Sequence, residues 1–357
     1  MENVKALLEE LVNKNGSDLH ITVGSPPRLR IDGRLVNLGE TPLKPADAKE
    51  LVYGLLTTDQ VAEFEKRKEL DFSFGLAGVG RFRTNVFYQR GSVGGVLRSI
   101  PTNIKNFSEL GLPEKTCTAL CSLPKGLILL TGATGCGKST TLASMIDFIN
   151  STRASHIVTV EDPIEFLHKN KLSHINQREV GQDTESFTRA LRSALRQDPD
   201  VVLIGEMRDL ETIEAALVIS ETGHLTFGTL HTSDAVQTIN RIVDVFPAHQ
   251  QQQIRTQLSF TLQAAISQEL IKADDGGRAL AAEILIANSA VKALIRDGKT
   301  HQIYSVIQTN QRMGMTTMNQ SLARLVRDGR ISLESALARS TASEELAKLL
   351  QMETSMA

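Results

Sequence analysis

The first hundred residues of this chain combine two spacings of apolar side chains. Strand-like alternation of apolar and polar residues recurs in three stretches, and one stretch between them has helical spacing: 18–23, 28–38 and 80–100 for the strands, 45–66 for the helix. We therefore expect an α+β domain over residues 1–100, followed by a linker at 101–115 that contains turn residues.

The next part of the chain, residues 116–275, alternates short apolar runs with helical stretches. The runs predict buried strands at 127–130, 157–160, 201–204 and 225–229. This order predicts a parallel sheet covered by helices, with ligands bound at the carboxyl ends of the strands. After the glycines at 276 and 277 the spacing becomes mostly helical, so we expect a helical region at 276–357.

One segment identifies a ligand. Residues 132–139 read GATGCGKS, a complete G-x-x-x-x-G-K-S/T phosphate-binding loop between a predicted strand and a predicted helix. Glycines let the backbone amides turn inward, and the helix N-terminus attracts phosphate. Lys138 is expected to reach the β- and γ-phosphates, and Ser139 to ligate Mg²⁺. The expected cofactors are ATP and Mg²⁺, with these loop contacts: Gly132, Thr134, Gly135, Cys136, Gly137, Lys138, Ser139 and Thr140.

Carboxylates follow two of the predicted strands. Glu206 comes two residues after the run 201–204, where it can hold Mg²⁺ through water or orient the attacking water. The alternative for Glu206 is an exposed glutamate at a strand end. Glu161 and Glu165 lie in the acidic segment after the run 157–160, and they are catalytic candidates unless this segment is an ordinary solvated loop.

Two histidines, His224 and His231, flank a short predicted strand, and both are candidates to sense the terminal phosphate. Their spacing equally fits histidines that only form structural hydrogen bonds, and it does not suggest zinc, because no cysteine or third histidine lies at ligand spacing. Arginines that can supply charge to a γ-phosphate, within one chain or from a neighbouring subunit, are also candidates, with surface ion pairs as the alternative: Arg81, Arg83, Arg90, Arg189, Arg192 and Arg196.

Composition limits the partners. The formal net charge of −2 gives no basic footprint, so we expect no nucleic-acid partner. The three cysteines suit a reducing compartment, and no apolar run approaches the length of a membrane span. These features predict a cytoplasmic protein that is peripheral to the membrane. A nucleic-acid motor and a scaffold that binds ATP without turnover are the alternatives from other functional classes.

Together these motifs resemble the secretion-superfamily ATPases, and within them the type IV pilus retraction ATPases. The resemblance runs nearly end to end and rests on the phosphate-binding loop and four further segments: Ser17–His20 with Gly24–Pro27, the acidic box at 161–165, the Walker B segment at 205–209 and the histidine box at 224–231. It implies an α/β fold with a PAS-like α+β N-terminal domain, a RecA-like P-loop ATPase domain and a helical C-terminal region.

The resemblance also implies an assembly and a task. The expected form is a homohexameric ring at the cytoplasmic face of the inner membrane, where it acts on the platform protein PilC and powers pilus retraction and twitching motility. The accessory retraction ATPase PilU is a further implied partner. In the family the carboxylate that matches Glu206 is catalytic, and the acidic box that matches 161–165 helps to arrange metal and water.

Two departures leave alternatives open. Cys136 stands where the family usually has a small residue such as serine, so oxidation would block the loop. Residues 290–297 read AVKALIRD in place of the retraction family's AIRNLIRE motif and keep four of its residues. A PilU-type accessory ATPase, or a pilus-extension or type II secretion ATPase, is therefore the alternative. The lack of a four-cysteine zinc element favours retraction over extension.

Overall fold

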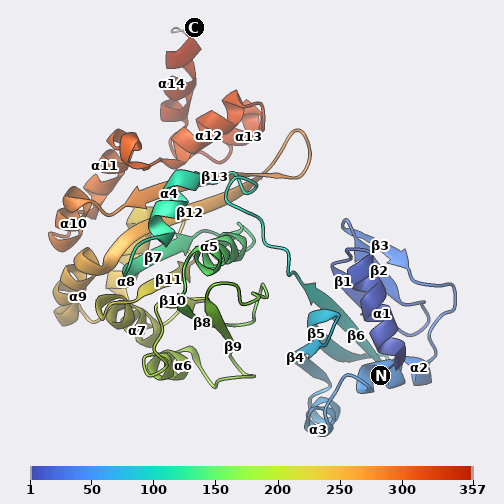
Figure 1. Cartoon of the computed structure of the whole chain (residues 1–357). Helices are drawn as coiled ribbons and strands as arrows, with labels where there is room; N and C mark the ends of the chain where they lie inside the picture. Colours follow the sequence, from blue (N-terminus) through green and yellow to red (C-terminus); the bar gives the residue numbers. More distant parts are fainter. Residues whose placement is uncertain (1, 355–357) are drawn as a thin grey trace. The chain divides into compact units, whose positions relative to one another are not determined.

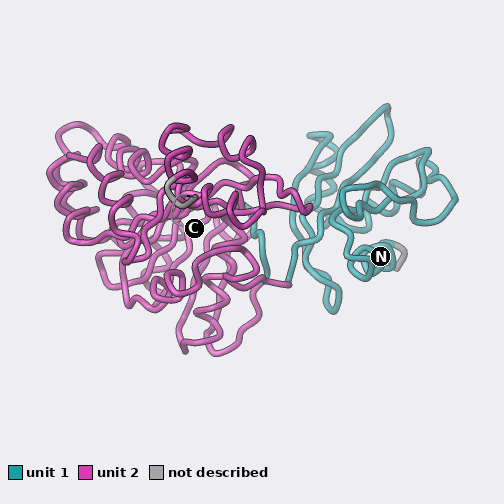
Figure 2. Tube along the Cα trace, turned by 90° about the horizontal axis from the view of Figure 1, so that it is seen from above, with its two compact units in different colours: residues 1–102, 163–167 teal, residues 103–162, 168–357 magenta. Residues whose placement is uncertain are grey.

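The computed structural model describes residues 2–354, which form two compact units. Unit 1 contains residues 1–102 together with 163–167, and unit 2 contains residues 103–162 and 168–357 (Figure 2). The acidic segment that follows residue 160 is therefore divided: Glu161 belongs to unit 2 and Glu165 to unit 1.

Unit 1 is an antiparallel sheet with three helices. Its strand order is β3-β2-β1-β6-β5-β4, and its buried core includes Leu19, Phe64, Phe82 and Leu97. The two-residue turn Asp32–Gly33 has positive φ at both positions, which matches the right-handed twist of the β2–β3 hairpin. The elements are α1 (Glu2–Asn13), β1 (Asp18–Ile21), β2 (Arg28–Ile31), β3 (Arg34–Asn37), α2 (Pro45–Tyr53), α3 (Thr58–Arg67), β4 (Glu69–Leu76), β5 (Gly80–Gln89) and β6 (Ser92–Ile100).

Unit 2 is built on a seven-stranded sheet of order β13-β12-β7-β11-β10-β8-β9, parallel except for β13. Every residue of β7, β10 and β11 is buried, as expected for parallel strands covered on both faces. The strands are β7 (Gly126–Thr131), β8 (His156–Glu161), β9 (His174–Glu179), β10 (Val201–Ile204), β11 (Leu225–Leu230), β12 (Leu262–Lys272) and β13 (Arg278–Ile286).

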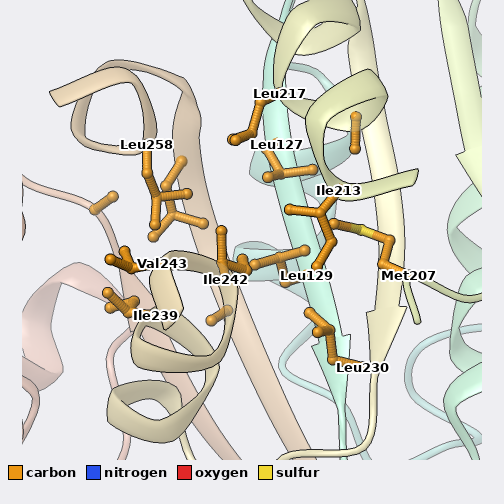
Figure 3. Close-up of a cluster of buried hydrophobic side chains, with 14 of the residues drawn as sticks. Leu127, Leu129, Met207, Ile213, Leu217, Leu230, Ile239, Ile242, Val243 and Leu258 are labelled. Carbon is orange, nitrogen blue, oxygen red and sulfur yellow. The ribbon is translucent and has the colours of Figure 1, made fainter. Parts of the chain in front are cut away.

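Helices cover both faces of this sheet (Figure 1). Alternate residues of β7 face opposite layers: Leu127 and Leu129 pack with Ile213 and Leu217 of one layer (Figure 3), whereas Ile128 packs in the other. The helices are α4 (Glu114–Cys121), α5 (Lys138–Thr152), α6 (Phe187–Ala194), α7 (Leu210–Glu221), α8 (Ala235–Asp244), α9 (Ala248–Thr261), α10 (Ser289–Arg296), η1 (Thr300–Gln302), α11 (Ile303–Thr309), η2 (Gln311–Met313), α12 (Met318–Arg327), α13 (Leu333–Leu337) and α14 (Ser343–Thr354).

The predicted α/β fold with an N-terminal domain and an ATPase domain is confirmed, but one region differs from the sequence pattern. Residues 278–286, which lie in the stretch expected to be mostly helical, form β13, and its hairpin with β12 crosses the boundary expected at residue 275. The segment is buried at almost every position, so it lacks the alternation that marks a half-buried strand. Within residues 2–354, no helix combines the length and apolarity that a membrane span requires.

Candidate active site

The phosphate-binding loop joins β7 to α5. Gly132, Gly135 and Gly137 have φ values of +133°, +80° and +96°, a region that favours glycine. A Cβ atom on Gly132 would lie 2.4 Å from the carbonyl oxygen of Gln268 and 2.7 Å from the Cys136 sulfur. Only glycine therefore lets the loop start this close to β12.

The start of α5 supplies the positive charge of the phosphate-binding loop, through Lys138 and the helix N-terminus. Lys138 is the first residue of α5, and the Lys138 Nζ donates hydrogen bonds to the carbonyl oxygens of Gly132 (2.7 Å) and Ala133 (3.1 Å). The first turn of α5 contains no acidic side chain, so its free N–H groups and the lysine form a site for an anion. Ser139 is exposed and Thr140 half-buried in this turn, whereas Thr134 and Gly135 are exposed in the loop.

Cys136 contributes its backbone to the loop and its side chain to the interior. Its thiol is buried, 4.0 Å from the Thr131 carbonyl oxygen. Burial raises the pKa of the Cys136 thiol, which keeps it protonated and unreactive, because the thiolate is the form that reacts. The oxidation sensitivity expected for this position is therefore opposed by its surroundings.

Glu206 and His231 meet at the same edge of the sheet. They follow β10 and β11, which are neighbouring parallel strands, and the His231 Nε2 lies 3.0 Å from the Glu206 Oε1. The Arg208 Nε lies 2.5 Å from the same oxygen. The loop after β7 begins at this edge too, because β7 is parallel to β11. The sheet thus brings the phosphate-binding loop and a carboxylate to one side.

The charge of Glu206 is fixed by its neighbours. The hydrogen bond from Arg208 is the largest influence and lowers the pKa of Glu206; partial burial opposes it, and His231 lowers the pKa further. Glu206 is therefore an ionised carboxylate at neutral pH, which is the form able to accept a proton from water or to attract a hydrated cation.

Glu161 lies beside this group. It ends β8, where its Oε1 accepts hydrogen bonds from the Thr159 hydroxyl (2.6 Å) and the Gln177 amide (3.2 Å). A Cβ atom on Gly205 would lie 3.1 Å from the Glu161 Cα, so glycine before Glu206 lets the two strand ends approach. Two carboxylates are thereby placed on adjacent strand ends.

One predicted site residue, His224, lies away from this edge, and another, Glu165, belongs to unit 1. His224 precedes β11, so the six residues of that strand, about 20 Å, separate it from His231. Its Nδ1 lies 3.0 Å from the Ile219 carbonyl oxygen near the end of α7, a structural contact. Glu165 is exposed in the segment 163–167, which belongs to unit 1, and its catalytic role stays a prediction.

The structure adds residues that the sequence pattern did not single out. Arg208 carried a signal, since it is an opposite charge two positions after Glu206. Gln268 carried none: it comes from β12, and its buried side-chain amide donates to the Thr141 hydroxyl in the first turn of α5 at 2.7 Å. Only the folded sheet places it under the loop.

The site suits a magnesium ion that comes with a nucleotide. Within the described chain, no cluster of three or more His, Cys, Asp or Glu side chains is arranged to hold a metal by itself. Mg²⁺ commonly takes few protein ligands and keeps phosphate oxygens and water. The exposed Ser139 hydroxyl and the ionised Glu206 are oxygen donors of the required kind.

The strand–loop–helix unit and the carboxylates beside it define a P-loop nucleotide-hydrolysing protein. The family model "Type II/IV secretion system protein" matches residues 1–338. The type IV pilus retractation ATPase PilT of Pseudomonas aeruginosa is 48% identical over 334 residues, which covers 94% of this chain and 97% of the relative. The type IV pilus ATPase PilU of the same organism is 41% identical over 347 residues, covering 97% and 91%.

A solved structure described as the pilus retraction motor PilT with bound ADP is similar throughout. It is 53% identical, with a TM-score of 0.89, and the match covers 96% of this chain and 98% of that one. The chain belongs to the type II/IV secretion system protein family. The predicted secretion-superfamily ATPase is confirmed.

Proposed function

We propose that the chain hydrolyses ATP to power type IV pilus retraction, and with it twitching motility. The observation that carries the proposal is the convergence of the phosphate-binding loop and the Glu206–His231 pair at one sheet edge. Near full-length similarity to a retraction ATPase supports retraction, rather than extension, of the pilus.

In this proposal each group has one task. The loop amides, the N-terminus of α5 and Lys138 hold the phosphates, and Glu206 orients the attacking water and accepts its proton. His231 and Arg208 fix the Glu206 carboxylate, while Glu161 adds negative charge on the adjacent strand end. Bound Mg²⁺, with Ser139 as its protein ligand and Glu206 reaching it through water, would neutralise charge on the β- and γ-phosphate oxygens.

The assembly proposed is a homohexameric ring in the cytoplasm, docked on the platform protein PilC at the inner membrane, with PilU as an accessory partner. Arg192 and Arg196 support shared sites, because both are exposed, Arg192 in α6 and Arg196 two residues after its end, and neither forms an ion pair within the described chain. Light scattering that finds only a monomer with full ATPase activity would contradict the ring.

The second candidate is a PilU-type accessory ATPase, which the 41% identity to that relative favours. An accessory ATPase adds to a motor that another ATPase supplies. Deleting the gene separates the two: loss of retraction supports the main proposal, whereas weakened but continuing retraction supports the accessory role.

The test of the main proposal counts surface pili after that deletion. Retained but immobile pili are expected, because extension continues without retraction. Cells without pili would instead indicate an extension ATPase. An ATPase rate that DNA stimulates would point to a nucleic-acid motor, and ATP binding without hydrolysis would point to a scaffold.

A further inference from the structure

A buried carboxylate joins two helices of unit 2 away from the phosphate-binding loop. Glu283 lies in β13 and is only 3% exposed. Its Oε1 accepts a hydrogen bond from the backbone N–H of Ala235 at 2.9 Å, and the backbone N–H of Met318 also hydrogen-bonds to this carboxylate. Ala235 and Met318 are the first residues of α8 and α12.

Both N–H groups belong to the class that has no partner within its own helix. A carboxylate satisfies them and also interacts favourably with the positive ends of two helices. The arrangement still has a cost, since burial raises the pKa of Glu283 to about 7 and the neighbouring Asp234 adds to the rise. No basic group of the described chain forms an ion pair with Glu283. Because the partners of this buried carboxylate are the first backbone N–H groups of α8 and α12, we expect it to fix the position of these helices.

One of these helices begins beside the proposed catalytic pair. Ala235 follows His231 by four residues, and His231 lies 3.0 Å from Glu206. The connecting segment 232–234 is held to the first turn of α8, because the hydroxyl groups of Thr232 and Thr238 lie 2.6 Å apart and Asp234 caps the helix. Fixing the first amide of α8 therefore restrains the segment that carries His231.

The other helix is fixed to the same strand. Thr316, just before α12, exchanges backbone hydrogen bonds of 2.8 and 3.1 Å with Ile284, the residue next to Glu283. Figure 1 shows α12 beside β13. Strand β13 thus holds both the start of α8, which follows the His231 segment, and the start of α12.

We propose that Glu283 is a positioning residue for ATP hydrolysis: it holds the first turn of α8 so that His231 stays against Glu206, and it links this segment to α12. The inference rests on the proposed catalytic pairing of Glu206 with His231.

The test compares Glu283→Gln with Glu345→Gln. Glutamine keeps one acceptor oxygen but turns an NH₂ group toward a helix end that also donates. We expect kcat for ATP to fall about tenfold, with KM changed less than twofold, because the phosphate-binding loop is untouched. The matched control, Glu345, bonds to Tyr304 (2.6 Å) and Asn319 (3.0 Å) among the C-terminal helices, and its variant should keep kcat.

A double-mutant cycle shows whether Glu283 acts through His231. In a His231→Ala background, Glu283→Gln should cost little further kcat, since coupled residues are not additive. An unchanged kcat in Glu283→Gln, or the same fold-loss in both backgrounds, would overturn the inference alone. Wild-type hydrolysis by His231→Ala would refute the proposed pair and the inference with it.

If the glutamine variant does not fold, Glu283→Asp applies the same test with the charge kept and the reach shortened. We expect lower kcat and faster amide hydrogen exchange across residues 232–238. Wild-type kcat and exchange in this variant would contradict the role.

Discussion

Replacing Glu206 by glutamine removes the charge of the proposed water-orienting group and keeps its shape. The glutamine Oε1 can still accept hydrogen bonds from Arg208 and His231, which lie 2.5 and 3.0 Å from Oε1 in the wild type. What is lost is a carboxylate that is ionised at neutral pH. The variant therefore separates catalysis from folding.

The two expected effects differ greatly in size. Arg208 is 70% exposed, and an ion pair with so exposed a partner contributes about 0–1 kcal/mol to stability. Losing a general base costs about 10² to 10⁴ in rate, which corresponds to about 3–5 kcal/mol in the activation barrier. The rate of ATP hydrolysis should therefore fall far below that of the wild type, while the fold and nucleotide binding are kept.

The assay measures kcat, nucleotide affinity and thermal unfolding of the purified variant beside Asp209→Asn. Asp209 is the matched control: it lies in the same loop, but its Oδ1 accepts from the Thr212 N–H at 2.8 Å and caps α7, a contact that asparagine retains. Glu206→Gln should bind ATP and fail to hydrolyse it, whereas Asp209→Asn should do both. Near wild-type hydrolysis by Glu206→Gln would refute the assignment of Glu206 as the water-orienting group and make Glu165 the next candidate.

Four further predictions follow from other parts of the chain. Lys138→Ala should abolish nucleotide binding, measured with a fluorescent nucleotide, or turnover, measured as ATPase rate, because the proposal has Lys138 hold phosphate before and during the reaction. Gly205→Ala should lower the free energy of unfolding by about 1–3 kcal/mol in urea, since its Cβ would meet the Glu161 backbone at 3.1 Å; Gly75→Ala, with open space, should not. Burial raises the pKa of Glu283 from 4.5 to about 7, so the folded chain holds a proton there that the unfolded chain releases between these pH values. The free energy of unfolding of the wild type, relative to that of Glu283→Gln, should therefore fall by about 3 kcal/mol from pH 4.5 to pH 8. A difference that stays constant over this range would contradict a raised pKa at Glu283. Arg296→Ala, at the exposed end of α10, should abolish twitching with hydrolysis intact, whereas loss of both with a lower Tm would mean a structural role.

The sequence predicted the centre of the sheet well because its strands are short, largely apolar runs. The runs at 127–130, 201–204 and 225–229 lie within β7, β10 and β11, and the loop at 132–139 lies between a strand and a helix as its motif requires. The order of the strands was not available from the pattern, since β7, β11 and β10 are neighbours only through crossovers.

The remainder depended on tertiary placement. His224 and His231 looked equivalent in sequence, but a strand has two ends, and only the carboxyl end of β11 reaches the loop. Gln268 and Glu283 come from the β12–β13 hairpin, whose buried residues carry no period that separates strand from helix. Their roles follow from contacts with residues far away in the chain.

The central claim is that ATP turnover at the loop and Glu206 drives pilus retraction. Its most direct test follows labelled pili on living cells in which this chain is the sole retraction ATPase, comparing wild type with Glu206→Gln. We predict that the variant's pili extend and stay extended, with no retraction events. Retraction at wild-type frequency and speed would contradict the account.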